Sequence, residues 1–383
     1  MVEPSPPAMT RRRAREPKAP RFAMLDGLRF VAAFTVLGFH FTARETDAWQ
    51  TPVASRAPEV FDITKYGVFG VDLFFVISGF VILMTAWGRP LHQFVASRVS
   101  RLYPAYWACV LVTAGVLVIN GAHWISTSDV LINLTMAQEA FAVPHVDGVY
   151  WTLWVEMRFY ALMAVFILIG MTERRLVAFA VLWPVVAAIA EKTHFDFVAY
   201  ILVWQYAALF AGGMMLFLIV RNGHSTLRWL AVGADLLMAF ATSAPEAAER
   251  ILGTTGSGVP SMAALTCVML CFAAVAVVTM SPLRRVGWRW LSFLGALTYP
   301  LYLLHEQIGW VVIEHTQQLG WIPALFLATA VALLLAFGVH FLVERRGGPA
   351  LRRVLSQSLA PDSSHPARLE PSVTRSSVET SQS

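Results

Sequence analysis

The sequence predicts an all-α integral membrane protein that crosses the bilayer about ten times, with both chain ends in the cytoplasm. Of its 383 residues, 57% are hydrophobic and only 14% are charged, whereas soluble domains carry roughly 45–50% apolar and about 25% charged residues. The apolar stretches are long and continuous rather than alternating, which is typical of helices and not of barrel strands. The Lys and Arg residues lie mostly between these stretches.

The apolar stretches delimit ten predicted helices, of which the first, fifth and seventh carry the weakest signal. Their ranges are close to 25–43, 68–87, 103–120, 151–170, 176–190, 198–220, 229–241, 260–280, 291–313 and 322–343. The segments before and after them are rich in Pro, Arg and Ser, which predicts disordered cytoplasmic tails at residues 1–20 and 355–383. Residues 21–354 are therefore expected to form one transmembrane domain.

The distribution of basic residues gives the orientation of these helices. The segments 1–24, 88–102, 171–175, 221–228, 281–290 and 344–383 hold 22 of the 29 Lys and Arg residues. Cytoplasmic segments of membrane proteins carry such an excess, so these segments are predicted to be cytoplasmic. Adding or dropping one helix would break the alternation, which supports an even number of crossings.

The composition argues against several other classes of protein. The net charge of +5 does not indicate nucleic-acid binding, because the basic residues follow membrane topology and form no basic face. The three cysteines, Cys109, Cys267 and Cys271, lie inside apolar segments, where a thiol packs as a small hydrophobic group. We therefore expect no disulfide framework, no metal site and no bound cofactor. The oligomeric state is left open.

Ionisable residues inside the predicted helices are the candidates for function, since each costs about 2.5–3.5 kcal/mol at the bilayer centre. Arg29 and His40 lie eleven residues apart on the first helix, which is close to three full turns, so they share one face. Arg29 has a simple alternative role as a residue that extends to the cytoplasmic interface. Histidine is the usual proton-transfer group near neutral pH, which favours a functional role for His40.

Three further predicted helices carry polar groups within apolar sequence. These groups are Asp72 and Ser78 on the second helix, Glu156 and Tyr160 on the fourth, and Tyr302, His305 and Glu306 on the ninth. A rise of 1.5 Å per residue along each predicted helix puts His40, His305 and Glu156 at similar depths. These three side chains are therefore expected to share one layer in the outer half of the bilayer.

Arg98 and Arg101, on the loop after the second helix, mark the cytoplasmic face together with Arg29. These three arginines predict a positively charged entrance on the cytoplasmic side, which we call the basic mouth. The layer that holds His40, Glu156 and His305 would lie above it, below an opening on the outer side. Buried ionisable groups of this kind suit an enzyme or a proton-coupled transporter equally well. The two halves of the chain show no internal repeat, whereas many transporters are built from repeats.

Five segments, in this order, resemble those of acyltransferase family 3. They are Leu25–Arg29 with His40, Phe69–Phe80, Arg98–Pro104, Trp151–Tyr160 and Thr298–His305, and the resemblance spans roughly residues 24–345. Members of this family are polytopic membrane enzymes that move acyl groups from acyl-CoA onto hydroxyls, mostly of sugars. The sequence departs from the family's pattern in three places. Thr152 replaces a serine, and Met157-Arg158 replaces Glu-Gln. Glu344-Arg345-Arg346 lacks the proline that usually follows.

The resemblance implies a function for the site. Acyl-CoA is expected to enter from the cytoplasm, with its phosphates at the basic mouth and its thioester near Ser78 and His40. His40 is expected to take the proton of the acceptor hydroxyl, and an acyl-histidine relay is an open alternative. Glu156 would orient His40 or bind the acceptor.

The other candidates, Asp72, Tyr160, Tyr302 and His305, would position substrates or bind the acceptor. The acceptor itself is open, because the family modifies cell-envelope glycans such as O-antigen, peptidoglycan and exopolysaccharide as well as glycosylated secondary metabolites such as macrolides. The acyl length is open too, with acetyl or a similar group expected. The resemblance thus implies an acyl-CoA-dependent O-acyltransferase of a bacterial inner or plasma membrane, and a proton-coupled transporter is the alternative.

Overall fold

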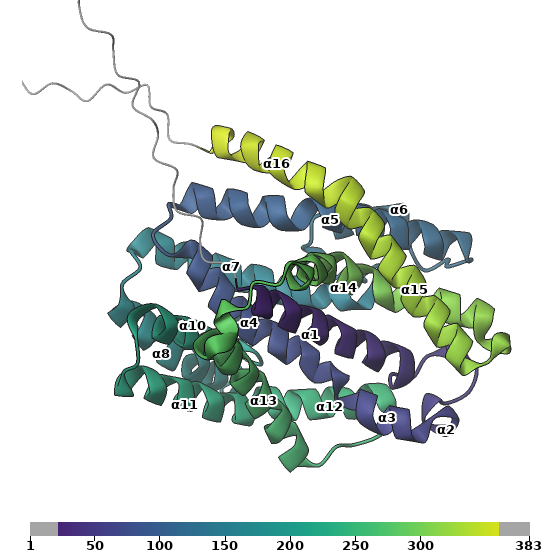
Figure 1. Ribbon diagram of the computed structural model, residues 1–383, viewed down its shortest axis with the longest axis horizontal. Helices are drawn as coiled ribbons and strands as arrows, with labels where there is room; N and C mark the ends of the chain where they lie inside the picture. The colour runs from purple at the N-terminus through teal and green to yellow at the C-terminus, as the bar shows by residue number, and fades with distance from the viewer. Residues whose placement is uncertain (1–21, 360–383) are drawn as a thin grey trace, which may run out of the picture.

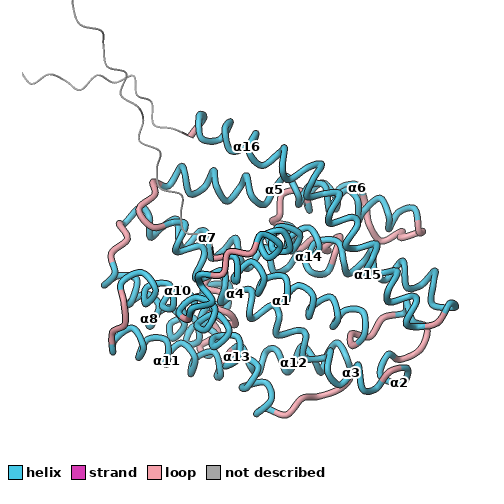
Figure 2. Tube along the Cα trace, in the orientation of Figure 1, coloured by secondary structure: helices cyan, strands magenta, loops and turns pink. Residues whose placement is uncertain are grey.

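The computed structural model describes residues 22–359, which form helices joined by loops, without a β-strand. Figures 1 and 2 show that most of these helices run along the length of the molecule and that the connecting loops are short. The prediction of an all-α fold is confirmed. The predicted tails at 1–20 and 355–383 lie outside the described residues, apart from the first few residues of the second.

Three helices form the centre of the bundle: α1 (Ala23–Thr42), α4 (Phe69–Ala86) and α14 (Arg289–Thr316). α1 packs against both of the others, and α10 (Ala207–Asn222) covers α4. A Cβ on Gly79 of α4 would lie 2.1 Å from the carbonyl oxygen of Phe210, and one on Gly213 of α10 would lie 2.0 Å from that of Val76. The two backbones therefore touch, as small residues allow in membrane helices.

Four helices cover one side of this centre. They are α5 (Leu91–Ile119), α7 (Trp151–Ile169), α15 (Trp321–Val339) and α16 (Arg345–Ser358). α15 packs on α14, and α7 contacts both α4 and α5. α16 packs on α5, so that the two run side by side along one edge of the molecule (Figure 1).

A second group of helices surrounds α10 on the other side. α8 (Glu173–Lys192), α11 (Thr226–Ala241) and α13 (Ser261–Met280) each contact α10. α12 (Ser243–Thr255) packs on α11 and α13.

Shorter helices complete the loops. The α-helical ones are α2 (Val53–Arg56), α3 (Pro58–Thr64), α6 (Thr127–Asn133) and α9 (Asp196–Ile201). The 3-10 turns are η1 (Asp47–Trp49), η2 (Lys65–Val68), η3 (Gln138–Phe141), η4 (Gly148–Tyr150), η5 (Pro282–Arg285) and η6 (Gln317–Leu319). A π-helical segment, η7 (His340–Glu344), joins α15 to α16.

Seven helical stretches within residues 22–359 are long and apolar enough to cross a membrane. They are Ala23–Thr42, Pro58–Ala86, Leu91–Ile119, Gly148–Ile169, Thr226–Thr255, Ser261–Met280 and Trp321–Ser358, and α10 is apolar but shorter. The chain is therefore a multi-pass membrane protein, as the composition predicts. Ten crossings and the cytoplasmic position of both ends stay predictions.

Several helix boundaries differ from the predicted ones. The segment with Arg98 and Arg101 is not a loop, because α5 begins at Leu91 and carries both residues. α12 lies between the seventh and eighth predicted helices, where the sequence predicts no helix, and α16 continues to Ser358. Each of these segments mixes polar and apolar residues, so a search for continuous apolar stretches does not find it. The predicted helix 198–220 is divided into α9 and α10, and Val203 between them has a φ of 56°.

Candidate active site

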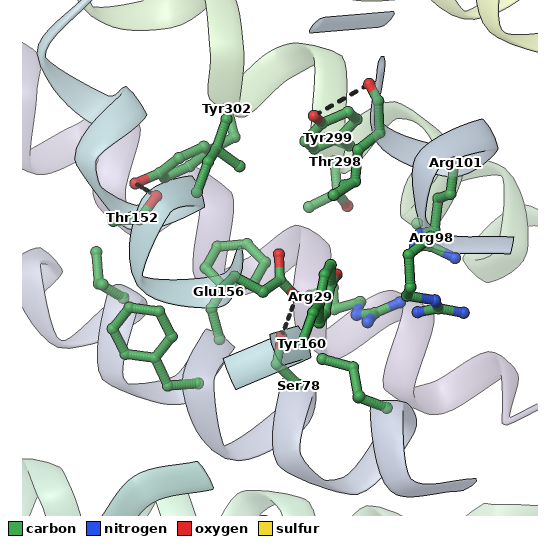
Figure 3. A pocket seen from close by; sticks show the side chains of 17 residues that line it. Arg29, Ser78, Arg98, Arg101, Thr152, Glu156, Tyr160, Thr298, Tyr299 and Tyr302 are labelled. Carbon is green, nitrogen blue, oxygen red and sulfur yellow. Dashed lines mark hydrogen bonds between the residues drawn. The ribbon is translucent and has the colours of Figure 1, made fainter. Parts of the chain in front are cut away.

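A cavity of about 790 Å³ lies between α1, α4, α5, α7 and α14; we call it the basic cavity. Figure 3 shows Arg29, Arg98 and Arg101 gathered on one side of it. Arg98 and Arg101 stand three residues apart on α5, so they share one face of that helix. Arg98 is buried, whereas Arg101 is exposed. The arginines therefore run from the protein interior to its surface and bring three positive charges to the cavity.

Arg98 has an unused donor for an anion. Its guanidinium lies 5.9 Å from the ring centre of Tyr160 and 6.0 Å from that of Phe94. Its Nε is buried and has no hydrogen-bond partner among the described residues. A buried N–H without a partner is costly, and a phosphate oxygen would satisfy it.

The rest of the basic cavity combines apolar side chains with a hydrogen-bonded serine–glutamate pair. Ser78 of α4 donates a hydrogen bond of 2.9 Å from its Oγ to Oε1 of Glu156 on α7. Tyr160 follows Glu156 by one turn and also lines the cavity. The remaining wall is formed by Val71, Phe74, Phe75, Ile82, Leu102 and Leu153, with Gly295, Thr298 and Tyr299 from α14.

Tyr302 and Thr152 lie at the end of the basic cavity opposite the arginines (Figure 3). The hydroxyl oxygen of Tyr302 is 3.0 Å from Oγ1 of Thr152 and donates a longer bond of 3.4 Å to the carbonyl of Val149. Thr152 itself donates to the same carbonyl at 3.0 Å. These bonds join the middle of α14 to the start of α7.

A second pocket of about 380 Å³ begins beyond Tyr302; we call it the histidine pocket. It is bounded by the later parts of α1 and α14, by the turns before α4 and α7, and by α12. Its ionisable residues are His40, Arg44, Arg250 and Glu306. Val71 and Tyr302 line both cavities.

His40 and His305 form a buried pair in and beside the histidine pocket. Nε2 of His305 lies 3.0 Å from Nδ1 of His40, which is also 3.0 Å from the carbonyl of Val36. Nδ1 of His305 lies 2.9 Å from the carbonyl of Tyr302. Because a carbonyl can only accept, both Nδ1 atoms are assigned the proton. This tautomer leaves Nε2 of His40 as an unprotonated base.

A carboxylate stands beside that nitrogen. Oε2 of Glu306 is 3.8 Å from Nε2 of His40, and Oε1 of Glu306 is 3.0 Å from a guanidinium nitrogen of Arg44. The indole of Trp310 donates to the backbone carbonyl of His40 at 3.0 Å and so supports this turn of α1. The arrangement can take up a proton at His40 and stabilise the resulting positive charge with Glu306.

Asp147 lies next to this cluster, just before η4. Its carboxylate accepts bonds from the backbone N–H groups of Val149 and Gln307, at 3.2 and 3.3 Å. Burial raises the pKa of Asp147 well above its usual range, and the negative charge of Glu306 raises it further. Asp147 therefore ties the start of α7 to α14 next to the Glu306 carboxylate.

Arg250 of α12 closes another side of the histidine pocket. Its guanidinium lies 4.7 Å from the ring centre of Trp151, and it donates to the hydroxyl of Tyr206. Trp151 also lines the pocket, so an aromatic face and a positive charge meet there. The Arg250 guanidinium lies over the Trp151 ring as a cation–π contact, so this wall of the pocket is both aromatic and positively charged.

The structure brings most of the predicted site residues together, but in two groups. Arg29, Ser78, Arg98, Arg101, Glu156, Tyr160 and Tyr302 line the basic cavity, whereas His40 lies in the histidine pocket with His305 against it. The hydrogen-bond partner of Glu156 is Ser78, and the carboxylate beside His40 is Glu306. Asp72 lines neither cavity; it is 1% exposed, and neither of its carboxylate oxygens has a hydrogen-bond partner among residues 22–359.

Three residues of the pocket receive no role from the sequence. Glu306 is noted there as a buried polar group of the ninth helix, directly after His305, but without an assigned function. Arg44 and Arg250 gave no such signal. They lie at or beyond the ends of predicted helices, where arginine is ordinary, and only the folding of α12 brings Arg250 to the pocket.

The fold defines a multi-pass membrane protein, and the site combines an anion-binding cavity with a buried histidine base. The chain belongs to acyltransferase family 3: the profile of this family, described as an acyltransferase domain, matches residues 22–341. The protein is thus a membrane acyltransferase, as the five motifs predict.

Individual relatives agree with this family. The chain is 30% identical over 362 residues to a protein of Komagataeibacter xylinus named as a membrane-bound transacylase, BcsY; the match covers 84% of this chain and 82% of that protein. It is 26% identical over 166 residues to the peptidoglycan O-acetyltransferase OatA of Listeria monocytogenes, covering 38% of this chain and 24% of OatA.

A third relative is the acyltransferase MdmB of Streptomyces mycarofaciens, which is 27% identical over 154 residues, 38% of each chain. The chain thus spans well under half of OatA and MdmB, in contrast to its match with BcsY. No solved structure matches the chain.

Proposed function

We propose that this protein transfers an acetyl or similar acyl group from acyl-CoA to a hydroxyl of a sugar, in a cell-envelope glycan or a glycosylated secondary metabolite. The observation that carries the proposal is that the basic cavity and the histidine pocket adjoin at Tyr302 and Val71. One cavity has the charge that a CoA phosphate needs, and the other holds a base for a hydroxyl. Their common boundary is where a thioester and an alcohol would meet.

Acyl-CoA would occupy the basic cavity. Arg98 and Arg101, with Arg29, would bind its phosphates, because guanidinium groups form paired hydrogen bonds with phosphate oxygens. The pantetheine arm would follow the apolar wall toward Tyr302. Glu156 and Ser78 lie along this path, and their side-chain oxygens would accept hydrogen bonds from the arm's amide N–H groups.

The acceptor would occupy the histidine pocket. OatA is named for O-acetylation of peptidoglycan, and a further relative, ExoZ of Rhizobium meliloti, is named for exopolysaccharide production. A sugar ring would lie beside Arg250 and Trp151, with one hydroxyl directed at His40. This placement explains why an aromatic face and a base occur in the same small pocket.

The chemical step follows from the tautomer of His40. Nε2 of His40 takes the proton of the acceptor hydroxyl while the hydroxyl oxygen attacks the thioester carbonyl carbon. The new C–O bond forms, the C–S bond breaks, and the proton passes from His40 to the CoA thiolate. Glu306, held by Arg44, stabilises the imidazolium between these events. An acyl-histidine intermediate would use the same nitrogen as nucleophile.

The direct test is His40→Ala in native membranes supplied with radiolabelled acetyl-CoA. General-base catalysis contributes about 10²–10⁴ in rate, so label transfer and CoA release should fall by at least the lower of these factors. His315→Ala is the matched control, because His315 lies on α14 but is exposed and outside both cavities. Normal turnover by the His40 variant would exclude the mechanism. A wild-type protein that moves protons but releases no CoA would be a transporter instead.

A further inference from the structure

Four of the helices around the site, α1, α4, α7 and α14, contribute residues to both cavities. On α1, Arg29 lines the basic cavity and His40 the histidine pocket. On α14, Tyr299 lines only the basic cavity and Glu306 only the histidine pocket, with Tyr302 between them lining both. The two cavities are therefore stacked along the helix axes.

The antiparallel helices show the same order in reverse. On α4, Val71 lines both cavities, and Phe74 and later residues line only the basic cavity. On α7, Trp151 lines the histidine pocket and the next residue, Thr152, the basic cavity. All four helices thus place the boundary at one level, and the side chains shared there are Tyr302 and Val71.

Tyr302 is fixed in this boundary from several directions. Its ring centre lies 5.7 Å from that of Phe74, which lines the basic cavity, and 5.7 Å from that of His305, which contacts His40. The bonds to Thr152 and to the Val149 carbonyl hold its hydroxyl. Tyr302 is 7% exposed and Val71 5%. A buried ring with two aromatic neighbours and a hydrogen-bonded hydroxyl has little freedom to move aside.

On the basis of the proposed function, we propose that Tyr302 and Val71 form a partition that limits this enzyme to short acyl groups and keeps water away from the thioester. The acyl group is the leading end of acyl-CoA, so its whole length must pass the partition before the carbonyl carbon reaches His40. Its tail would then share the histidine pocket, which Trp151, Arg250 and Glu306 already line, with the acceptor. An acetyl group fits these demands, whereas a long chain competes with the acceptor for the same space.

The partition also bears on a side reaction. If water in the histidine pocket reaches the thioester, its oxygen attacks the carbonyl carbon, the C–S bond breaks, and the products are a carboxylic acid and CoA. Exclusion of water from a closed site suppresses such hydrolysis. A wider opening should therefore raise hydrolysis and admit longer chains together, which a merely structural role for Tyr302 would not do.

The test measures CoA release by the full-length protein in detergent, with acetyl-, butyryl- and octanoyl-CoA and water as the only acceptor. Tyr302→Ala should raise acetyl-CoA hydrolysis and reduce the preference for acetyl over octanoyl by at least about tenfold, the low end of what a pocket gains from one methylene group. Tyr302→Phe keeps the ring and should keep the preference. Val71→Ala opens the partition from the other side and should act like Tyr302→Ala if that variant does not fold.

The matched control is Tyr299→Ala, one turn earlier on α14, where the ring lines only the basic cavity. It should change the KM for acyl-CoA but keep the preference for short chains. Wild-type chain preference and hydrolysis in both Tyr302→Ala and Val71→Ala would overturn the partition. A wild-type protein that neither transfers label to native membranes nor releases CoA would overturn the proposed function itself.

Discussion

At the scale of single residues, the chemistry of the site is set by which atoms face one another. The sequence shows that His40 shares a face with Arg29, and the structure adds that Nε2 of His40 is the free nitrogen and that Glu306 stands 3.8 Å away. The neighbouring Arg44 neutralises this carboxylate. A base, a carboxylate partner and a counter-charge are therefore assembled from the end of α1, the residues just after it and the interior of α14.

Glu306→Gln tests this assembly. We expect kcat to fall by about 10²-fold, the lower end of the contribution of general-base catalysis, because the imidazolium loses its stabilising charge. The KM for acyl-CoA should hardly change, because Glu306 does not line the basic cavity. Steady-state kinetics of CoA release would measure both constants.

The ion pair with Arg44 provides the control for that variant. Glu306→Gln also leaves Arg44 without its partner, so some loss of stability is expected, and Arg44→Gln in the same chain should restore it. If the double variant regains its thermal midpoint but not its kcat, the role of Glu306 is chemical. Recovery of kcat with stability would show that the carboxylate only holds the fold.

A variant of Arg98 should have the opposite kinetic effect from Glu306→Gln, on the KM for acyl-CoA rather than on kcat. A hydrogen bond to a charged group contributes about 1.5–3 kcal/mol, so Arg98→Ala should raise the KM for acyl-CoA about tenfold or more with a smaller effect on kcat. Arg284→Ala is the control, because Arg284 is exposed and lines neither cavity. An equal change in both variants, measured by titration with acetyl-CoA, would mean that surface charge alone attracts the substrate.

At the scale of helices, the sequence reveals those elements that are predominantly apolar. α4, α13 and α15 are such helices, and the predicted ranges for them are close to the observed bounds. α12 and α16 mix arginines and glutamates or serines with apolar residues, so their helical character depends on packing that a hydrophobic profile does not include. The position of Arg250 at the site could not be predicted for the same reason.

Contacts between helices depend on backbone distances that no residue pattern gives. Gly213→Ala would place a methyl group 2.0 Å from the carbonyl oxygen of Val76, and separating α4 from α10 should cost about 1–3 kcal/mol. We expect a lower thermal midpoint in detergent and weaker activity, because α4 carries Ser78 and Val71. Light-scattering or fluorescence melting curves would show the change.

Gly233→Ala is the matched substitution for this prediction. Gly233 lies inside α11, and a Cβ there meets nothing within 4 Å. Alanine is favoured over glycine inside a helix by roughly 0.5–1 kcal/mol, so this variant should melt at the same or a higher temperature. An equal fall in the thermal midpoint of both variants would show that the close α4–α10 contact does not stabilise the fold more than other helix positions do.

At the scale of the whole molecule, the order of the two cavities gives the protein a direction. The charge distribution of the loops predicts a cytoplasmic start of α1, and Arg29 lies near that start while His40 lies near the other end. Sequence reasoning could predict this separation, since eleven residues of helix span about 16 Å. It could not predict that Glu156 lies on the Arg29 side of the boundary, because depth estimates ignore the tilt and offset of each helix.

This order predicts that the enzyme takes up acyl-CoA from only one side of the membrane. Acyl-CoA is too polar to cross a bilayer unaided, so sealed vesicles with the basic cavity facing outward should release CoA from added acetyl-CoA. Vesicles of the opposite orientation should do so only after detergent opens them. Latent activity in right-side-out vesicles and full activity in inverted ones would place the basic cavity on the cytoplasmic side, together with the start of α1. Equal activity in both preparations would mean that the donor does not enter through the arginines, since Arg29, Arg98 and Arg101 all lie at the same end of the site.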